Sequence, residues 1–147
     1  YQVARTNEKA VSDIKNLFPE KNIFAFELNK SDEDPKENAL HLDCCFQPLG
    51  HGRCIIHKEG FLIEQEYQWL VDFFGPENCF HIDKQEMYHM NSNIFSISED
   101  VIISEKNFTR LNSWLVDKGY TVEEVYYGEI AKQEGLLRCS TMPLIRD

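Results

Sequence analysis

Long apolar stretches and basic residues are what this sequence has least of. No apolar run approaches the ~18 residues that a membrane-spanning helix needs, so the sequence contains no candidate span. Lys and Arg number 15 against 25 Asp and Glu, which gives a net charge of -10. Clustered cations bind nucleic-acid phosphates and anionic membrane surfaces, so we expect neither as a partner. A cationic small molecule is compatible with this charge.

No secretory signal is expected from the first residues. Residues 1–5 contain neither an initiator Met nor the apolar core of a signal peptide. The five cysteines form an odd set without even spacing, which is typical of reduced thiols rather than of a disulfide framework. We therefore expect a cytoplasmic protein, and a length of 147 residues fits one domain.

A repeat of about 45 residues runs through the chain. Trp-Leu-Val-Asp occurs at residues 69–72 and again at 114–117, each time within the apolar spacing of an amphipathic helix. Thr109 is expected to cap the second helix and Gly119 to end it. The expected strands cover residues 40–46, 54–56, 79–82, 93–97, 101–103 and 120–125, and the expected helices cover residues 61–74 and 108–115. The unit is therefore strand, strand, helix, strand.

The two ends of the chain resemble incomplete copies of the same unit. The first would have a helix over residues 10–18, capped by Thr6 or Asn7, and a strand over residues 22–28. The last would begin with a strand at residues 137–139. Repeats of this size need neighbours to cover their apolar faces. We therefore expect about two and a half units, and either a larger protein, a segment before the first residue or a homo-oligomer to complete them.

Two short segments about a hundred residues apart carry the residue types of a nucleophilic site. In an extended strand His41, Asp43 and Cys45 share one face, so an imidazole and a carboxylate can address the same ligand. The C-terminal segment is interpreted as an apolar strand that delivers Cys139 into a polar turn ended by Pro143. The structural alternatives are a strand whose polar face meets solvent, and a cysteine that packs as a small core residue.

These segments resemble the arginine deiminase and amidinotransferase superfamily, the guanidine-modifying pentein enzymes. The resemblance rests on the His-x-Asp at residues 41–43 and the Cys-x-Thr-x-Pro at 139–143, and it extends back to residues 5–7. It covers nearly all of this chain and only the latter half of a typical member. It implies an α/β propeller of five ββαβ units around a substrate channel. Residues 1–147 would be the C-terminal portion of that single catalytic domain.

The resemblance implies a role for each residue of the two segments. Cys139 would attack a guanidinium carbon as thiolate and form a covalent amidino adduct. His41 would protonate the departing amine and then activate water or an incoming amine. Asp43 would hold the guanidinium by charge-assisted hydrogen bonds. Neither a metal nor an organic cofactor is required by this chemistry.

Substrate contacts farther from the reacting carbon are also implied. Arg5 matches a position that binds a substrate carboxylate, and Asn91 and Ser92 match a segment that contacts the amino-acid end of the substrate. Each has a structural alternative: a solvated charge for Arg5, and an Asn-Ser-Asn turn for the other two. Family members carry a second guanidinium-binding carboxylate, and another acidic residue near the histidine, upstream of the region matched here.

The preferred hypothesis is a hydrolase acting on arginine or a related guanidino compound. An amidinotransferase using the same adduct is the close alternative. A non-catalytic half-propeller whose exposed strand edges pair with another chain is the alternative of a different class. Three Cys and three His lie within residues 41–57, but no C-x2-C or H-x3-5-H pair frames a zinc site, so zinc is not expected.

Overall fold

Two three-stranded sheets of identical topology form the frame of the molecule. The computed structural model describes residues 6–133 and 135–145. In each sheet the first strand is antiparallel to the second, and the second is parallel to the third. The strands are β1 (Phe46–Leu49), β2 (Arg53–Ile56) and β3 (Cys79–His81) in one sheet, and β4 (Phe95–Ser96), β5 (Val101–Glu105) and β6 (Thr121–Val125) in the other.

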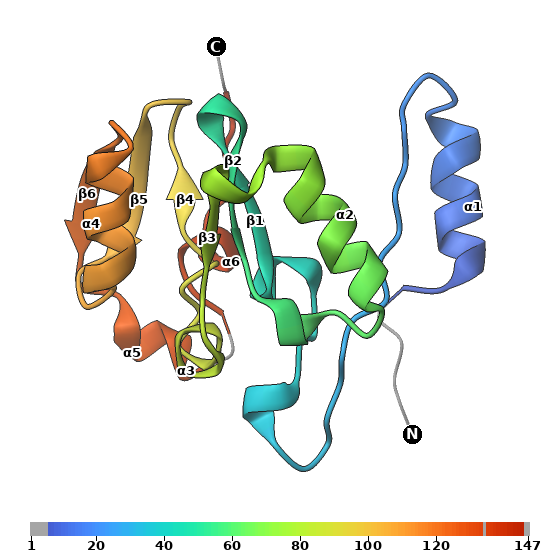
Figure 1. The fold of residues 1–147 in the computed structure, drawn as a ribbon, viewed down its shortest axis with the longest axis horizontal. Coiled ribbons are helices and arrows are strands. Elements are labelled where there is room, and N and C mark those ends of the chain that lie inside the picture. The colour runs from blue at the N-terminus through green and yellow to red at the C-terminus, as the bar shows by residue number, and fades with distance from the viewer. Residues whose placement is uncertain (1–5, 134, 146–147) are drawn as a thin grey trace.

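A helix connects the second and third strands of each sheet. These helices are α2 (Glu64–Phe74) and α4 (Thr109–Asp117), the two Trp-Leu-Val-Asp helices of the repeat. Figure 1 shows the two sheets side by side, with α4 lying along β5 and β6 and α2 beside the sheet of β1, β2 and β3. Two ββαβ units, hereafter blades, are therefore complete, as the repeat predicts.

Shorter helices connect and flank the blades. They are α1 (Glu8–Leu17), α3 (Lys84–Tyr88), α5 (Gly128–Ala131) and α6 (Leu137–Ser140), with 3-10 turns η1 (Pro35–Glu37), η2 (Leu42–Cys44), η3 (Gly50–Gly52), η4 (Lys58–Gly60) and η5 (Pro76–Asn78). Among the described residues, no helix combines the length and the apolar character needed to cross a membrane.

The N-terminal copy of the repeat is a helix without a sheet. The Asn7 side chain caps α1 by accepting a hydrogen bond from the Ala10 N–H at 2.9 Å, as predicted. No residue of α1 is buried, and Figure 1 shows the helix apart from both sheets. The strand predicted for residues 22–28 is wrong. This segment lies beside the loop that precedes α2, and that loop is not a strand. The segment therefore forms a single bridge, between Leu28 and Phe61, and no ladder of strand hydrogen bonds.

The start and end of α4 test the predicted capping residues. Thr109 is the first helical residue, and the N-cap is Phe108, which makes no side-chain capping bond. The predicted Thr109 cap is wrong because Phe108 is buried in the core and fixes the start of the helix by packing. Gly119 follows the helix end with φ +92°, a left-handed conformation that glycine adopts without strain. The predicted end is confirmed.

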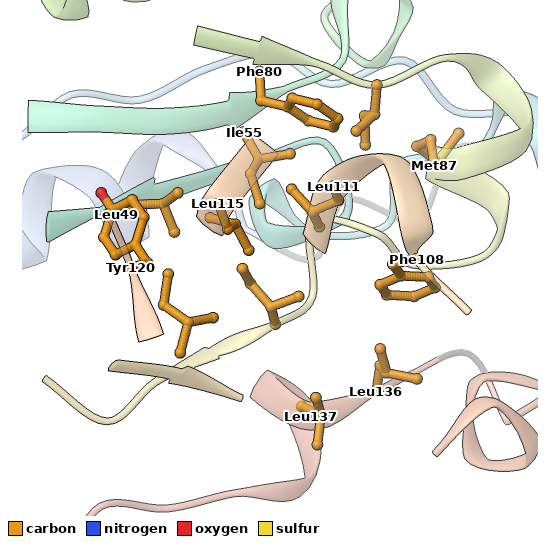
Figure 2. Packing of buried hydrophobic residues seen from close by; sticks show 13 residues of the cluster. Leu49, Ile55, Phe80, Met87, Phe108, Leu111, Leu115, Tyr120, Leu136 and Leu137 are labelled. Atoms are coloured by element: carbon orange, nitrogen blue, oxygen red, sulfur yellow. The ribbon is translucent and has the colours of Figure 1, made fainter. Parts of the chain in front are cut away.

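The main core lies between the two blades. Figure 2 shows Leu49, Ile55 and Phe80 of the first blade facing the α4 side chains of Leu111 and Leu115. Leu136 and Leu137 of the C-terminal segment close the same cluster from below. Full burial of one such side chain contributes about 1.5–3 kcal/mol, so this shared cluster holds the blades and the C-terminal segment together.

Polar contacts add to the junction between the blades. The Arg110 guanidinium of α4 donates to the His81 carbonyl oxygen at 2.7 Å and to both carboxylate oxygens of Glu86. This ion pair raises the pKa of Arg110. At the other end Tyr120 donates its hydroxyl to the Gly50 carbonyl oxygen. The relative position of the blades, and hence of any residues that meet between them, is fixed at both ends.

Candidate functional site

The segment before β1 is a turn and not the strand predicted for residues 40–46. Residues of η2 form the turn, and strand pairing begins only at Phe46. The Ser92 hydroxyl, from the second blade, donates to the carbonyl oxygens of Asp43 and Cys44 at 2.8 Å each. Since a side chain 48 residues away satisfies these carbonyls, the segment has no need of a neighbouring strand.

The residues predicted to share a strand face therefore have different surroundings. Cys45 is fully buried, and its Cβ lies so close to Gly60 that a Cβ added there would be 2.3 Å away. His41 is exposed and lines a hollow of about 470 Å³ together with residues 23–28. Asp43 is half-buried and faces the C-terminal segment. The predicted common face is wrong, but the prediction did select the carboxylate that meets Cys139.

The C-terminal segment is a helical turn and not the strand predicted for residues 137–139. Asn93 explains this difference because it caps α6 from outside. Its side-chain Oδ1 accepts hydrogen bonds from the N–H groups of Leu136 at 3.1 Å and Cys139 at 3.2 Å. Its backbone carbonyl accepts from the Arg138 N–H at 3.2 Å. A helix start needs acceptors for its first N–H groups, and here one asparagine supplies them.

Atoms of three side chains meet at the end of this turn. The Cys139 Sγ lies 3.8 Å from Asp43 Oδ2, and the Asn93 Nδ2 donates to the sulfur at 3.1 Å and to the same carboxylate oxygen at 3.3 Å. Asn93 is fully buried, whereas Cys139 is exposed. The arrangement presents a thiol to solvent beside a carboxylate, with a rigid amide between them.

The second carboxylate oxygen of Asp43 indicates what kind of ligand the site could bind. Asp43 Oδ1 is buried and has no hydrogen-bond partner among the described residues. A buried acceptor of this kind is costly unless a donor reaches it, and a cationic N–H donor forms the strongest such bond. The site can therefore receive a positively charged N–H group within reach of the sulfur.

The cysteines differ in reactivity. All five are free thiols, and burial raises the pKa of four of them, namely Cys44, Cys45, Cys54 and Cys79. The thiolate is the nucleophile, so these four are poor nucleophiles at neutral pH. Cys139 is the exposed one.

The other predicted site residues have mixed outcomes. Arg5 lies outside the described residues. Asn91 and Ser92 are buried, and the Ser92 hydroxyl is occupied with the two carbonyls of the turn before β1. Their contacts with a substrate stay predictions. The sequence pattern does not single out Asn93, because the pattern makes it the first residue of a predicted strand. The signal available was a polar residue directly before Ile94, which is fully buried.

Metal ligation has little support in the described part of the chain. No group of three or more His, Cys, Asp or Glu side chains there could hold a metal ion. Two of the three cysteines within residues 41–57 have other contacts: Cys54 donates its S–H to Cys79 at 3.5 Å, and Cys45 donates to the Leu42 carbonyl oxygen at 3.5 Å.

The fold has counterparts among solved structures. The N-terminal domain of ArgZ, an arginine dihydrolase from the ornithine–ammonia cycle in cyanobacteria, matches with a TM-score of 0.75 at 20% identity, over 91% of this chain and 46% of that one. SxtG, an amidinotransferase of the saxitoxin pathway from Microseira wollei, matches with a TM-score of 0.71 at 16% identity, over 96% of this chain and 40% of that one. This chain has the pentein fold.

At the sequence level the likeness is less informative about function. Over 143 residues this chain is 29% identical to the uncharacterized protein YkgA of Bacillus subtilis. The match covers 97% of this chain and 46% of that protein. No protein-family model matches. The chain spans less than half the length of YkgA and of the ArgZ domain.

Proposed function

We propose that residues 1–147 are the C-terminal portion of a single α/β-propeller catalytic domain of a guanidine-modifying enzyme. The reaction would be hydrolysis of arginine or a related guanidino compound through a covalent thiol–amidino adduct. One observation carries this proposal: the exposed Cys139 sulfur lies 3.8 Å from Asp43, whose other oxygen is a buried acceptor without a partner among the described residues. A planar cation with several N–H donors suits that pair of groups.

The family resemblance implies one role for each group. Asp43 holds guanidinium N–H groups and thereby fixes the carbon over the sulfur. The Cys139 thiolate forms a C–S bond to that carbon, and the C–N bond to the departing amine breaks as His41 gives that amine a proton. Water then adds to the carbon, its proton passes to His41, and the C–S bond breaks to release the ureido product.

Recognition of the rest of the substrate is assigned to three further residues. Arg5 would bind a substrate carboxylate, and Asn91 and Ser92 would contact the amino-acid end. Ser92 also holds the turn that carries Asp43, which gives it a structural role independent of any substrate.

The solved relatives support this reading of the site. A form of the ArgZ domain with one cysteine replaced by serine is bound to its substrate, and another variant of that domain is covalently bound to a reaction intermediate. Both facts concern ArgZ. They favour covalent chemistry at a cysteine in a fold that this chain shares.

The test is product formation from arginine, methylated arginine and agmatine, measured as ureido compound, ornithine or ammonia. We expect turnover in the protein and its loss in Cys139→Ser. The matched control is Cys79→Ser, which removes a buried thiol that contacts Cys54 and is expected to keep turnover. Turnover that survives Cys139→Ser would reject Cys139 as the nucleophile. Turnover lost equally in both variants, with the fold intact, would reject the selectivity claimed for the exposed cysteine.

An amidinotransferase is the second candidate, because the likeness to SxtG extends over 96% of this chain. The same adduct would then pass to an amine in place of water. Adding a primary amine acceptor such as glycine separates the two reactions: an amidino product formed at the expense of ureido product favours transfer, and unchanged ureido product favours hydrolysis.

A further inference from the structure

A fully buried asparagine joins the two halves of the candidate site. Asn93 uses every polar group of its side chain: Oδ1 accepts two backbone N–H groups of the C-terminal turn, and Nδ2 donates to Cys139 Sγ at 3.1 Å and Asp43 Oδ2 at 3.3 Å. We propose that Asn93 is a positioning residue, which holds the Cys139 sulfur beside Asp43 and stabilises its thiolate form by donating an N–H group to it. The inference rests on the proposed role of Cys139 as a nucleophile.

The hydrogen-bond pattern fixes the orientation of this amide. Backbone N–H groups can only donate, so the atom that receives both of them is the oxygen. The NH₂ group must then face the sulfur and the carboxylate. Because α6 starts at this oxygen, rotating or removing the amide would shift the whole turn that carries the thiol.

The amide has an electrostatic effect as well as a geometric one. The Asp43 carboxylate lies 3.8 Å from the sulfur, and two negative charges at this distance repel each other. A neutral N–H donor placed against both atoms offsets this repulsion, because a hydrogen bond to the charged form favours that form. The cationic substrate would complete the effect on binding.

The first experiment is Asn93→Asp, which keeps the oxygen that caps the turn, removes the NH₂ donor and places a second carboxylate beside the sulfur. Alkylation of the protein by iodoacetamide reads the Cys139 thiolate without any substrate, since the other four cysteines are buried. We expect the pH midpoint of alkylation to rise by about one unit or more, so that the rate at pH 7 falls about tenfold. An unchanged midpoint in a folded Asn93→Asp protein overturns the inference.

A control variant separates this effect from general damage to the fold. Asn112→Asp makes the same chemical change at another buried asparagine, which donates to the Glu105 carbonyl at 3.0 Å in the second blade. This variant is expected to leave the alkylation midpoint within a few tenths of a unit of that of the unmodified protein. A shift in Asn112→Asp equal to that in Asn93→Asp also overturns the inference.

If Asn93→Asp does not fold, the unmodified protein supplies the test. The side-chain amide protons of Asn93, followed by ¹⁵N-correlated NMR, are expected to titrate with the same midpoint as Cys139 alkylation and to lose that titration in Cys139→Ser. If the chemical shifts of these amide protons do not change as the sulfur ionises, the inference is contradicted. Neither alkylation nor NMR requires turnover. A protein that processes no guanidine would therefore contradict the proposed function, while the role of Asn93 would still be tested separately.

Discussion

The two blades are built alike and begin differently. Each has an antiparallel pair followed by a parallel strand, and each carries Trp-Leu-Val-Asp on its helix. The segment before β1 is a 3-10 turn that carries Asp43, whereas the segment before β4 passes through Met90, at φ 65°, to Asn93. Both segments reach Cys139. The repeated elements form the frame, and the unrepeated segments at equivalent places carry the residues of the proposed site.

The blade helices also differ in what they bury. Leu115 of α4 is fully buried in the cluster shared by both blades, whereas Leu70 of α2 packs within the first blade. Trp114 is half-buried against Phe80, with ring centroids 5.1 Å apart, while Trp69 is 39% exposed. The helix of the second blade therefore packs in the core that joins the two blades, whereas the helix of the first blade is more exposed.

The largest effect is expected from removing the charge that the first blade contributes. Asp43→Asn keeps the shape of the side chain but weakens its hold on a cation, so we expect kcat/KM for the guanidino substrate to fall by about 10²-fold or more. Steady-state kinetics measures this, and circular dichroism checks the fold. Asp100→Asn, at an exposed aspartate that contacts His51 at 2.7 Å, is the control and should stay within about twofold. Equal losses in the two variants would remove Asp43 from the site.

The difference in helix burial predicts unequal losses of stability. Leu115 and Leu70 occupy the same position in the repeat. Truncating a buried leucine to alanine lowers the free energy of unfolding by about 2–5 kcal/mol. We expect the larger loss for Leu115→Ala because its cavity opens in the core shared by the blades. Urea unfolding measures both free energies. A larger loss for Leu70→Ala would contradict the assignment of the junction to the second blade.

A smaller effect is expected where the second blade holds the Asp43 turn. Ser92→Ala leaves two carbonyl oxygens without their donor, so we expect the free energy of unfolding to fall by about 1–2 kcal/mol. Ser104→Ala is the matched control: Ser104 is fully buried, and its hydroxyl oxygen has no hydrogen-bond partner among the described residues. That variant should lose little or no stability. If both variants lose the same amount in urea unfolding, the Ser92 hydrogen bonds contribute nothing specific.

The sequence predicted the frame well because the frame repeats. The two helices with Trp69 and Trp114 and the strands around them follow from apolar spacing that occurs twice. His41, Asp43 and Cys139 were selected through the family resemblance, and two of these three lie together in the structure. The exposed position of Cys139 also argues against the alternative of a buried core cysteine.

The shapes of the two site segments could not be predicted in the same way. Local alternation favoured strands at both places, but Ser92 and Asn93 impose turns through hydrogen bonds to residues 48 and 46 positions away. No local pattern encodes such partners. Asn93 could not be predicted for the same reason, since its hydrogen-bond partners lie far from it in the sequence and become neighbours only in the fold.

The most direct test of the account compares a cationic with a neutral alkylating agent. A haloacetamidine carries a planar cation like a guanidinium, and the matching haloacetamide does not. If Asp43 and Cys139 form one cation-binding site, the cationic reagent should label Cys139 at least about tenfold faster relative to its rate with free cysteine, and Asp43→Asn should abolish that preference. Peptide mass mapping measures the labelling. No preference for the cation, or a preference that survives Asp43→Asn, would contradict the account.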